Sequence, residues 1–134
     1  MGQPYLGEIR IAGFNFAPSG WALANGQVMA MSQNVALSNL IGATYGGDGI
    51  STFALPNIQS RVPMHMGQGT GLSPRVQGQL GGVESTTFVA AQVPSAPPAP
   101  ISALAPAGPA LASVSPFVVV NFIIALSGIF PSQS

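Results

Sequence analysis

The near absence of charge is the feature that most limits what this chain can fold into. Only six of its 134 residues are charged, three acids and three arginines, and no lysine occurs. About a quarter of the residues in an ordinary globular domain are charged. Residues 11–47 and 85–134 contain no charge at all. Because surface charge keeps copies of a protein apart in solution, we expect much of this surface to be buried against other copies of the same chain.

The composition also excludes several classes of function. Apolar residues make up 47% of the chain, which is enough for a real core and too many for a charged, disordered chain. Three scattered arginines cannot neutralise a line of phosphates, so we expect no nucleic-acid binding. The lack of cysteine rules out disulfides and thiolate metal sites. The most apolar stretch, residues 117–130, is shorter than the roughly 20 residues of a membrane-spanning helix, so no membrane span is expected.

The first part of the chain, residues 1–66, is typical of a small globular domain that is mainly β with one short helix. Asn25-Gly26 favours a tight turn, because both residues tolerate positive φ. Ser32 stands where a helix N-cap would, apolar residues follow at helical spacing, and Gly42 stands at the C-cap position. Alternating or apolar runs bounded by turn residues predict strands at residues 6–12, 21–24 and 51–55.

The rest of the chain is divided by composition into three segments. Residues 67–93 are glycine-rich and extended, with a strand expected at residues 85–90. Residues 94–116 hold seven of the thirteen prolines, which favours an extended chain and forbids a long helix. Residues 117–134 form a hydrophobic strand segment.

The β-branched and aromatic run at residues 116–126 predicts one long strand that is buried on both faces. A single chain with so little helix cannot easily cover both faces, so we expect a partner copy to do so. The residues expected at this contact between chains are Phe117, Val119, Phe122, Ile124, Leu126, Ile129 and Phe130.

Several short segments together resemble the phage tail-collar family, which includes the microcystin-dependent proteins. The most distinctive are the Phe-Ala-Pro-Ser-Gly-Trp-Ala-Leu run at residues 16–23 and the Thr-Tyr-Gly-Gly-Asp-Gly run at residues 44–49. The others lie at residues 7–10, 25–27, 32–37, 51–57, 61–63 and 120–131.

The resemblance implies a small collar domain on a homotrimeric fibre in which three parallel chains interweave their strands. It also implies a location on a virion or phage-tail-like particle, or outside the cell or on its surface. Residues 1–8 have neither the basic start nor the apolar run of a signal peptide, so the export route stays open. Many relatives carry a His-Thr-His stretch after the Gln-x-Pro step. This chain has Ala96-Pro97-Pro98-Ala99 after Gln92-Val93-Pro94-Ser95, so it cannot bind metal there.

His65 is the only histidine, and any catalytic triad or imidazole metal site would have to use it. Its Met64-His65-Met66 setting favours a structural role. On a threefold axis one histidine per chain would still become three metal ligands, so a symmetric metal site is the alternative. The acids are far apart in sequence, which favours structural ion pairs over acid–base catalysis. Asp48 lies in a glycine-rich run that favours a turn over a cation or phosphate loop.

We therefore expect a non-enzymatic structural subunit of a homotrimeric extracellular or phage-tail-like fibre. Head-to-tail polymerisation into a filament is an open extension of this hypothesis. No cofactor is expected, and the main partner is another copy of the chain. The alternative is a receptor- or glycan-binding tail-fibre or adhesin protein, whose partner would be a host or cell-surface receptor. The Pro/Ala-rich segment contains neither Tyr nor Trp, which argues against that alternative.

Overall fold

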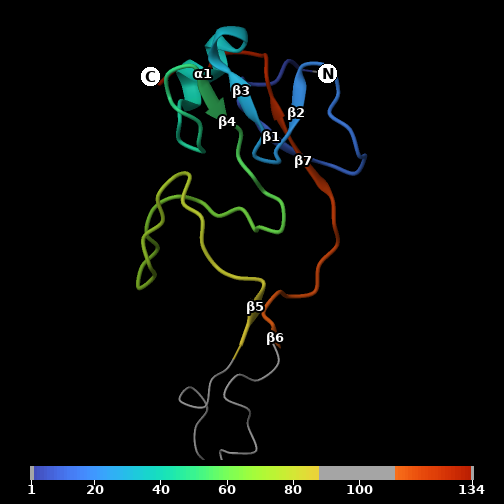
Figure 1. Cartoon of the computed structure of the whole chain (residues 1–134), viewed down its shortest axis with the longest axis vertical. Helices are drawn as coiled ribbons and strands as arrows, with labels where there is room; N and C mark the ends of the chain where they lie inside the picture. Colours follow the sequence, from blue (N-terminus) through green and yellow to red (C-terminus); the bar gives the residue numbers. More distant parts are fainter. Residues whose placement is uncertain (1, 88–110, 134) are drawn as a thin grey trace, which may run out of the picture. The chain divides into compact units, whose positions relative to one another are not determined.

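The computed structural model describes residues 2–87 and 111–133 of the chain (Figure 1). Its contacts form two units, Met1–Gln79 with Val119–Ser134 and Leu80–Val118. The described residues are mainly β with one short α-helix, as the sequence predicts. The first unit holds the helix and five of the strands, and the second holds the remaining two.

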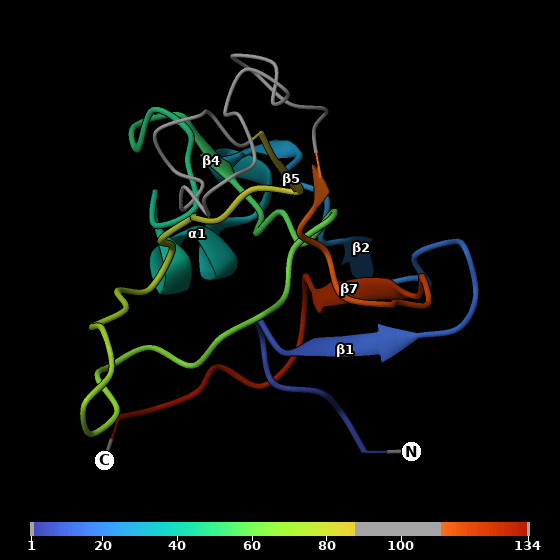
Figure 2. The same cartoon turned by 90° about the horizontal axis from the view of Figure 1, so that it is seen from below.

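The larger unit is built around a three-stranded antiparallel sheet. Its order is β1 (Ile9–Ala12), β7 (Asn121–Ala125) and β2 (Trp21–Leu23), so the last strand of the chain lies between the first two. Figure 2 shows β7 with β1 along one side and β2 on the other. The chain therefore completes this sheet only when its C-terminal part returns to its N-terminal part.

The predicted long strand at residues 116–126 is wrong in length, because β7 has only five residues. Asn121 pairs with Ala12, the last residue of β1, and residues 117–120 have no strand partner among the described residues. At the other end, the N–H of Leu126 donates to the carbonyl of Gly20, and the chain then turns. Three consecutive residues of β7, from Ile123 to Ala125, are buried, so both faces of that part are covered.

A second, two-stranded sheet pairs β3 (Val28–Ala30) with β4 (Thr52–Ala54), and the helix α1 (Val35–Ile41) lies between them in sequence. The helix ends at Gly42, whose N–H donates to the carbonyl of Ser38 at 2.8 Å, as predicted. The predicted N-cap is wrong. Ser32 lies inside a 3-10 turn (Met31–Gln33), and Asn34 takes the cap position. The N–H of Asn34 bonds to the Met31 carbonyl, which closes this tighter turn first and delays the α-helix by two residues.

The core of this unit is formed by side chains from both ends of the chain. The largest fully buried side chains are those of Leu37 in α1, Phe53 in β4, Leu55 just after it and Ile124 in β7. Leu6 and Ala22 complete the cluster. The N–H of Leu6 also donates to the carbonyl of Ile129 at 2.8 Å. Removal of the C-terminal strand would therefore remove part of the core.

The smaller unit contains a two-stranded antiparallel sheet of β5 (Ser85–Thr86) and β6 (Leu111–Ala112). The N–H of Ser113 donates to the carbonyl of Glu84 at 2.9 Å, and the Ser113 hydroxyl donates to the carbonyl of Val83 at 2.7 Å. The strand predicted at residues 85–90 therefore begins where expected. Residues 88–90 and most of the proline-rich segment, residues 94–110, lie outside the described residues.

Candidate assembly surface

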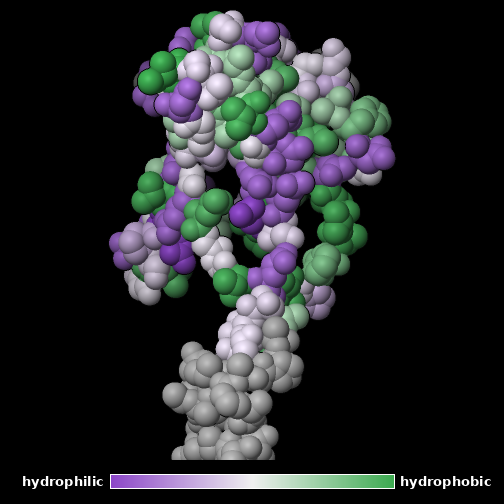
Figure 3. Space-filling model, viewed as in Figure 1, coloured by the Kyte–Doolittle hydropathy of each residue, from purple (hydrophilic) through white to green (hydrophobic). Residues whose placement is uncertain are grey.

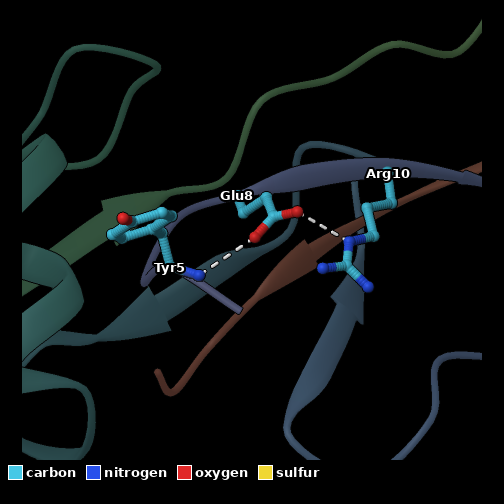
Figure 4. Close-up of polar contacts among 3 residues, drawn as sticks. All are labelled: Tyr5, Glu8 and Arg10. Atoms are coloured by element: carbon cyan, nitrogen blue, oxygen red, sulfur yellow. Dashed lines mark hydrogen bonds and ion pairs between the residues drawn. The ribbon is translucent and has the colours of Figure 1, made fainter. Parts of the chain in front are cut away.

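One pair of the chain's few charges lies at the start of β1. Arg10 Nε donates to Glu8 Oε1 at 2.6 Å, and the Tyr5 N–H donates to Glu8 Oε2 at 2.9 Å (Figure 4). The Arg10 guanidinium also lies over the Trp21 ring, 5.2 Å from its centroid. The hydrogen bond from Arg10, then that from Tyr5, lowers the pKa of the Glu8 carboxyl. This pair is the structural ion pair that the sequence favours over acid–base catalysis.

The carboxylate of Asp48 is used to hold its own loop. Its Oδ1 accepts from the N–H groups of Ile50, Ser51 and Thr52, each at 2.8 Å, and its Oδ2 accepts from the Ser51 hydroxyl at 2.7 Å. The hydroxyl bond, followed by the three main-chain bonds, holds the pKa of Asp48 well below its usual value. These bonds confirm the prediction of a turn.

Gly47 lets this loop lie directly on β4. It has a φ of +92°, and a Cβ at this position would lie 2.5 Å from the Cα of Phe53. The Ala54 N–H donates to the carbonyl of Gly46 at 3.0 Å, which ties the loop to the same strand. The Thr-Tyr-Gly-Gly-Asp-Gly run is therefore explained by packing within the domain.

Exposed apolar side chains gather in two segments with little secondary structure. In residues 62–83 and residues 117–119 these side chains are between 56% and 84% exposed. Figure 3 shows hydrophobic side chains along the run that leads into β7. They are Val62, Met64, Met66, Leu72, Val76, Leu80, Val83, Phe117, Val118 and Val119. Single exposed apolar residues are ordinary, whereas a run of them such as residues 117–119 makes a candidate contact surface.

The seven residues predicted at the contact between chains fall into two groups. Ile124 is 1% exposed, Leu126 packs against the same core, and Phe122 is half-buried, all within one chain. The other four are exposed: Phe117 by 77%, Val119 by 78%, Ile129 by 48% and Phe130 by 52%. In the isolated chain, only the exposed four are free to meet a partner.

His65 is exposed, and its Nδ1 lies 2.7 Å from the carbonyl oxygen of Met66. Among residues 2–87 and 111–133, no three His, Cys, Asp or Glu side chains are grouped closely enough to hold a metal ion. Any metal at His65 would therefore need ligands from other copies, so the symmetric site stays a prediction.

Sequence reasoning did not single out a further apolar group at β1 and the loop that follows it. Ile9 is 41% exposed and Ile11 is 68% exposed. Phe14 and Phe16 are also exposed, with ring centroids 4.9 Å apart. The alternation of apolar and polar residues around Ile9 and Ile11 indicated a strand. It could not show whether the two side chains are exposed, because that depends on where β1 lies in the sheet.

Comparison with known proteins finds a family match for the N-terminal part of the chain. The family model of the phage tail collar domain matches residues 7–63, which run from just before β1 to beyond β4. A comparison with curated proteins gave no significant match. No helix among the residues that the structure describes has the length and apolar character needed to cross a membrane. Residues 7–63, less than half of the chain, are thus similar to the phage tail collar domain, and this match indicates a structural protein of the phage tail-fibre type.

Proposed function

We propose that this chain is the subunit of a homotrimeric extracellular or phage-tail-like fibre. Head-to-tail polymerisation into a filament is an open extension of this proposal. Its partner is another copy of itself, and its place is outside the cell or on a phage-tail-like particle. The collar-domain match supports a structural role of this kind. The charge-poor composition supports association with a partner that is equally poor in charge.

One observation carries the proposal, namely the exposure of apolar side chains in residues 62–83 and 117–119. Full burial of one Val, Leu, Met or Phe side chain is worth about 1.5 to 3 kcal/mol. Burial of this set against other copies would contribute on the order of 10 to 20 kcal/mol per chain. Association costs about 4 to 15 kcal/mol in lost freedom. The exposed surface is therefore large enough to drive assembly.

Assembly in the fibre would involve the terminal segment in two ways. Phe117, Val119, Ile129 and Phe130 are exposed and would meet another copy directly. Ile124 would contribute between chains only if β7 were exchanged, in which case it would make its present core contacts within another copy's sheet.

The test is the size and shape of the purified protein, by light scattering coupled to size exclusion and by negative-stain electron microscopy. We expect trimers and filaments. Deleting residues 117–134 is not a suitable perturbation, because it removes β7 from the core. Val119→Lys is better, because it places a charge on a side chain that is 78% exposed.

The matched control is Ile50→Lys, because Ile50 is 88% exposed and lies outside both apolar segments. We expect Val119→Lys to weaken assembly and Ile50→Lys to leave it unchanged. A monomer at about 100 µM, roughly a hundredfold above a micromolar dissociation constant, would refute the proposal. Specific binding on a glycan array by the purified protein would favour the receptor-binding function instead.

A further inference from the structure

The outer edge of β1 carries unpaired main-chain groups. The N–H of Ala125 donates to the carbonyl of Glu8 at 2.9 Å, so Glu8 faces β7. Alternate residues of an antiparallel strand face the same neighbour, so Arg10 and Ala12 also face β7. The N–H and C=O groups of Ile9 and Ile11 therefore point away from the sheet. Among the described residues, neither of the two takes part in a main-chain hydrogen bond outside the β1–β7 ladder.

Apart from the shortness of β1, which has four residues, this edge shows few of the usual protections of an exposed sheet edge among the described residues. Natural edge strands are commonly guarded by Lys, Pro or a bulge, which discourage pairing with another chain. β1 contains neither Lys nor Pro, and its one charge, Arg10, is held by Glu8 and lies over Trp21. Ile9 and Ile11 are exposed on one face, where they offer apolar contact beside the open hydrogen-bonding groups. Figure 2 shows β1 at the outer side of its sheet.

Residues 117–120 also lack main-chain hydrogen-bond partners among the described residues, so they could pair with such an edge. They are an unbroken Phe-Val-Val-Val run of high strand propensity, with exposures of 77%, 84%, 78% and 39%. Among the described residues, no main-chain hydrogen bond involves this segment. They cannot serve the β1 of their own chain. Asn121, the next residue in the chain, is already paired with Ala12 on the inner edge of β1, so the residues directly before it are too close in sequence to pair along the outer edge as well.

We propose that the open edge of β1 binds residues 117–120 of a second copy as an added strand. The inference rests on the proposed self-assembly and names the two surfaces that meet. The added strand satisfies the outward groups of Ile9 and Ile11 and covers their side chains. Because the two surfaces differ, the contact is heterologous. Repetition of the same contact closes a ring of three copies or continues as a filament.

Cross-linking tests this contact directly, because the chain has no cysteine of its own. The Ile11→Cys variant is mixed with the Val118→Cys variant or with the Val119→Cys variant under unfolding conditions. Each mixture is then refolded together and mildly oxidised. The disulfide-linked products are resolved by mass spectrometry. A disulfide forms only when the two Cβ atoms lie about 3.5 to 4.5 Å apart. Neighbouring strand residues point to opposite faces, so we expect a mixed disulfide with one partner to exceed the other by about tenfold. Ile11→Cys with Ile50→Cys is the matched control.

The outcomes separate this inference from the proposed function. Assembled fibres with no mixed disulfide above the control would overturn the inference and leave the fibre proposal intact. Disulfides of Ile11→Cys with itself alone would show a two-fold pairing of β1 with β1, which also overturns it. A protein that stays monomeric overturns both.

A backbone variant provides the second measurement. Ile11→Pro removes the N–H that points away from the sheet and leaves the bonds to β7 in place, and proline is tolerated on edge strands in this orientation. We expect a folded protein, judged by Trp21 fluorescence, whose assembly requires about tenfold higher concentration. If the proline variant fails to fold, Ile11→Lys blocks the same edge by charge. Wild-type assembly of a folded Ile11→Pro or Ile11→Lys variant would overturn the inference.

Discussion

Substitution of Gly47 by alanine should destabilise the collar domain far more than the same substitution two residues later. Both Gly47 and Gly49 have positive φ, +92° and +73°, so both substitutions introduce the backbone strain of an L-residue in that region. They differ in the space available. A Cβ on Gly49 would lie 3.4 Å from the Cβ of Ala43, which is ordinary contact.

A Cβ on Gly47 would meet the backbone of β4. It would lie 2.5 Å from the Cα of Phe53, 2.7 Å from the carbonyl oxygen of Thr52 and 2.9 Å from the N of Phe53. Carbon atoms in favourable contact are about 3.5 to 4.0 Å apart, so the loop or the strand must move by about 1 Å. Phe53 is completely buried, and such a shift would disturb its packing.

The expected cost follows from these two contributions. The backbone strain is worth about 1 to 2 kcal/mol in both variants. Overpacking typically adds about 1 to 3 kcal/mol, and only Gly47→Ala incurs it. We therefore expect the free energy of unfolding to fall by about 2 to 5 kcal/mol in Gly47→Ala and by about 1 to 2 kcal/mol in Gly49→Ala. Because a domain is stable by only about 5 to 15 kcal/mol, Gly47→Ala should lose a substantial share of its stability.

Urea denaturation measures the difference, with Trp21 as the only tryptophan reporting on β2. All variants are compared at one protein concentration, because association with other copies would raise apparent stability. If the two alanine variants unfold within about 0.5 kcal/mol of each other, the close approach of the loop to β4 is not present in solution.

Three further outcomes are expected. Ile124→Ala should lower the free energy of unfolding by about 2 to 5 kcal/mol in urea, because Ile124 is 1% exposed, whereas the 78% exposed Val119 should tolerate alanine with little change. The pKa of Asp48 is lowered in the folded state, so its carboxylate stabilises the fold above about pH 4 and this contribution is lost as the pH falls below that value; thermal melts of Asp48→Asn should therefore show a weaker dependence on acid. Assembly followed by light scattering should change little between about 0.1 M and 1 M NaCl, and strong weakening by salt would instead indicate contacts between charged groups.

The local elements of the collar domain were predictable from the sequence because their signals are local. Alternation around Ile9, the apolar run ending at Pro56 and the glycine after Ile41 identified two strands and the end of the helix. The helix start was misplaced because Ser32 has cap chemistry, whereas the first hydrogen bond actually closes a 3-10 turn. Such a choice between two turns depends on a few tenths of a kcal/mol and on tertiary contacts.

The candidate site was only partly predictable for a related reason. The sequence shows that residues 117–126 are apolar and strand-forming. It does not show at which residue the neighbouring strands of the sheet end, and this sets the length of β7. The boundary at Asn121 exists because β1 ends at Ala12, more than a hundred residues earlier in the chain. The side-chain bond from Asn121 Nδ2 to the Phe14 carbonyl, at 2.7 Å, spans 107 residues in the same way. Phe117 and Phe122 therefore look alike in the sequence but differ in exposure.

By itself, the sequence determined the charge deficit, the mainly β character with one short helix, and the resemblance to the tail-collar family. Each of these follows from composition or from patterns a few residues long, so none of them depends on contacts between distant parts of the chain. The place of β7 between β1 and β2, and the outer edge of β1 that no other strand covers among the described residues, follow only from the three-dimensional fold. Strand order is set by how well distant side chains such as Leu37, Phe53 and Ile124 fill one core, and that free energy belongs to the whole domain.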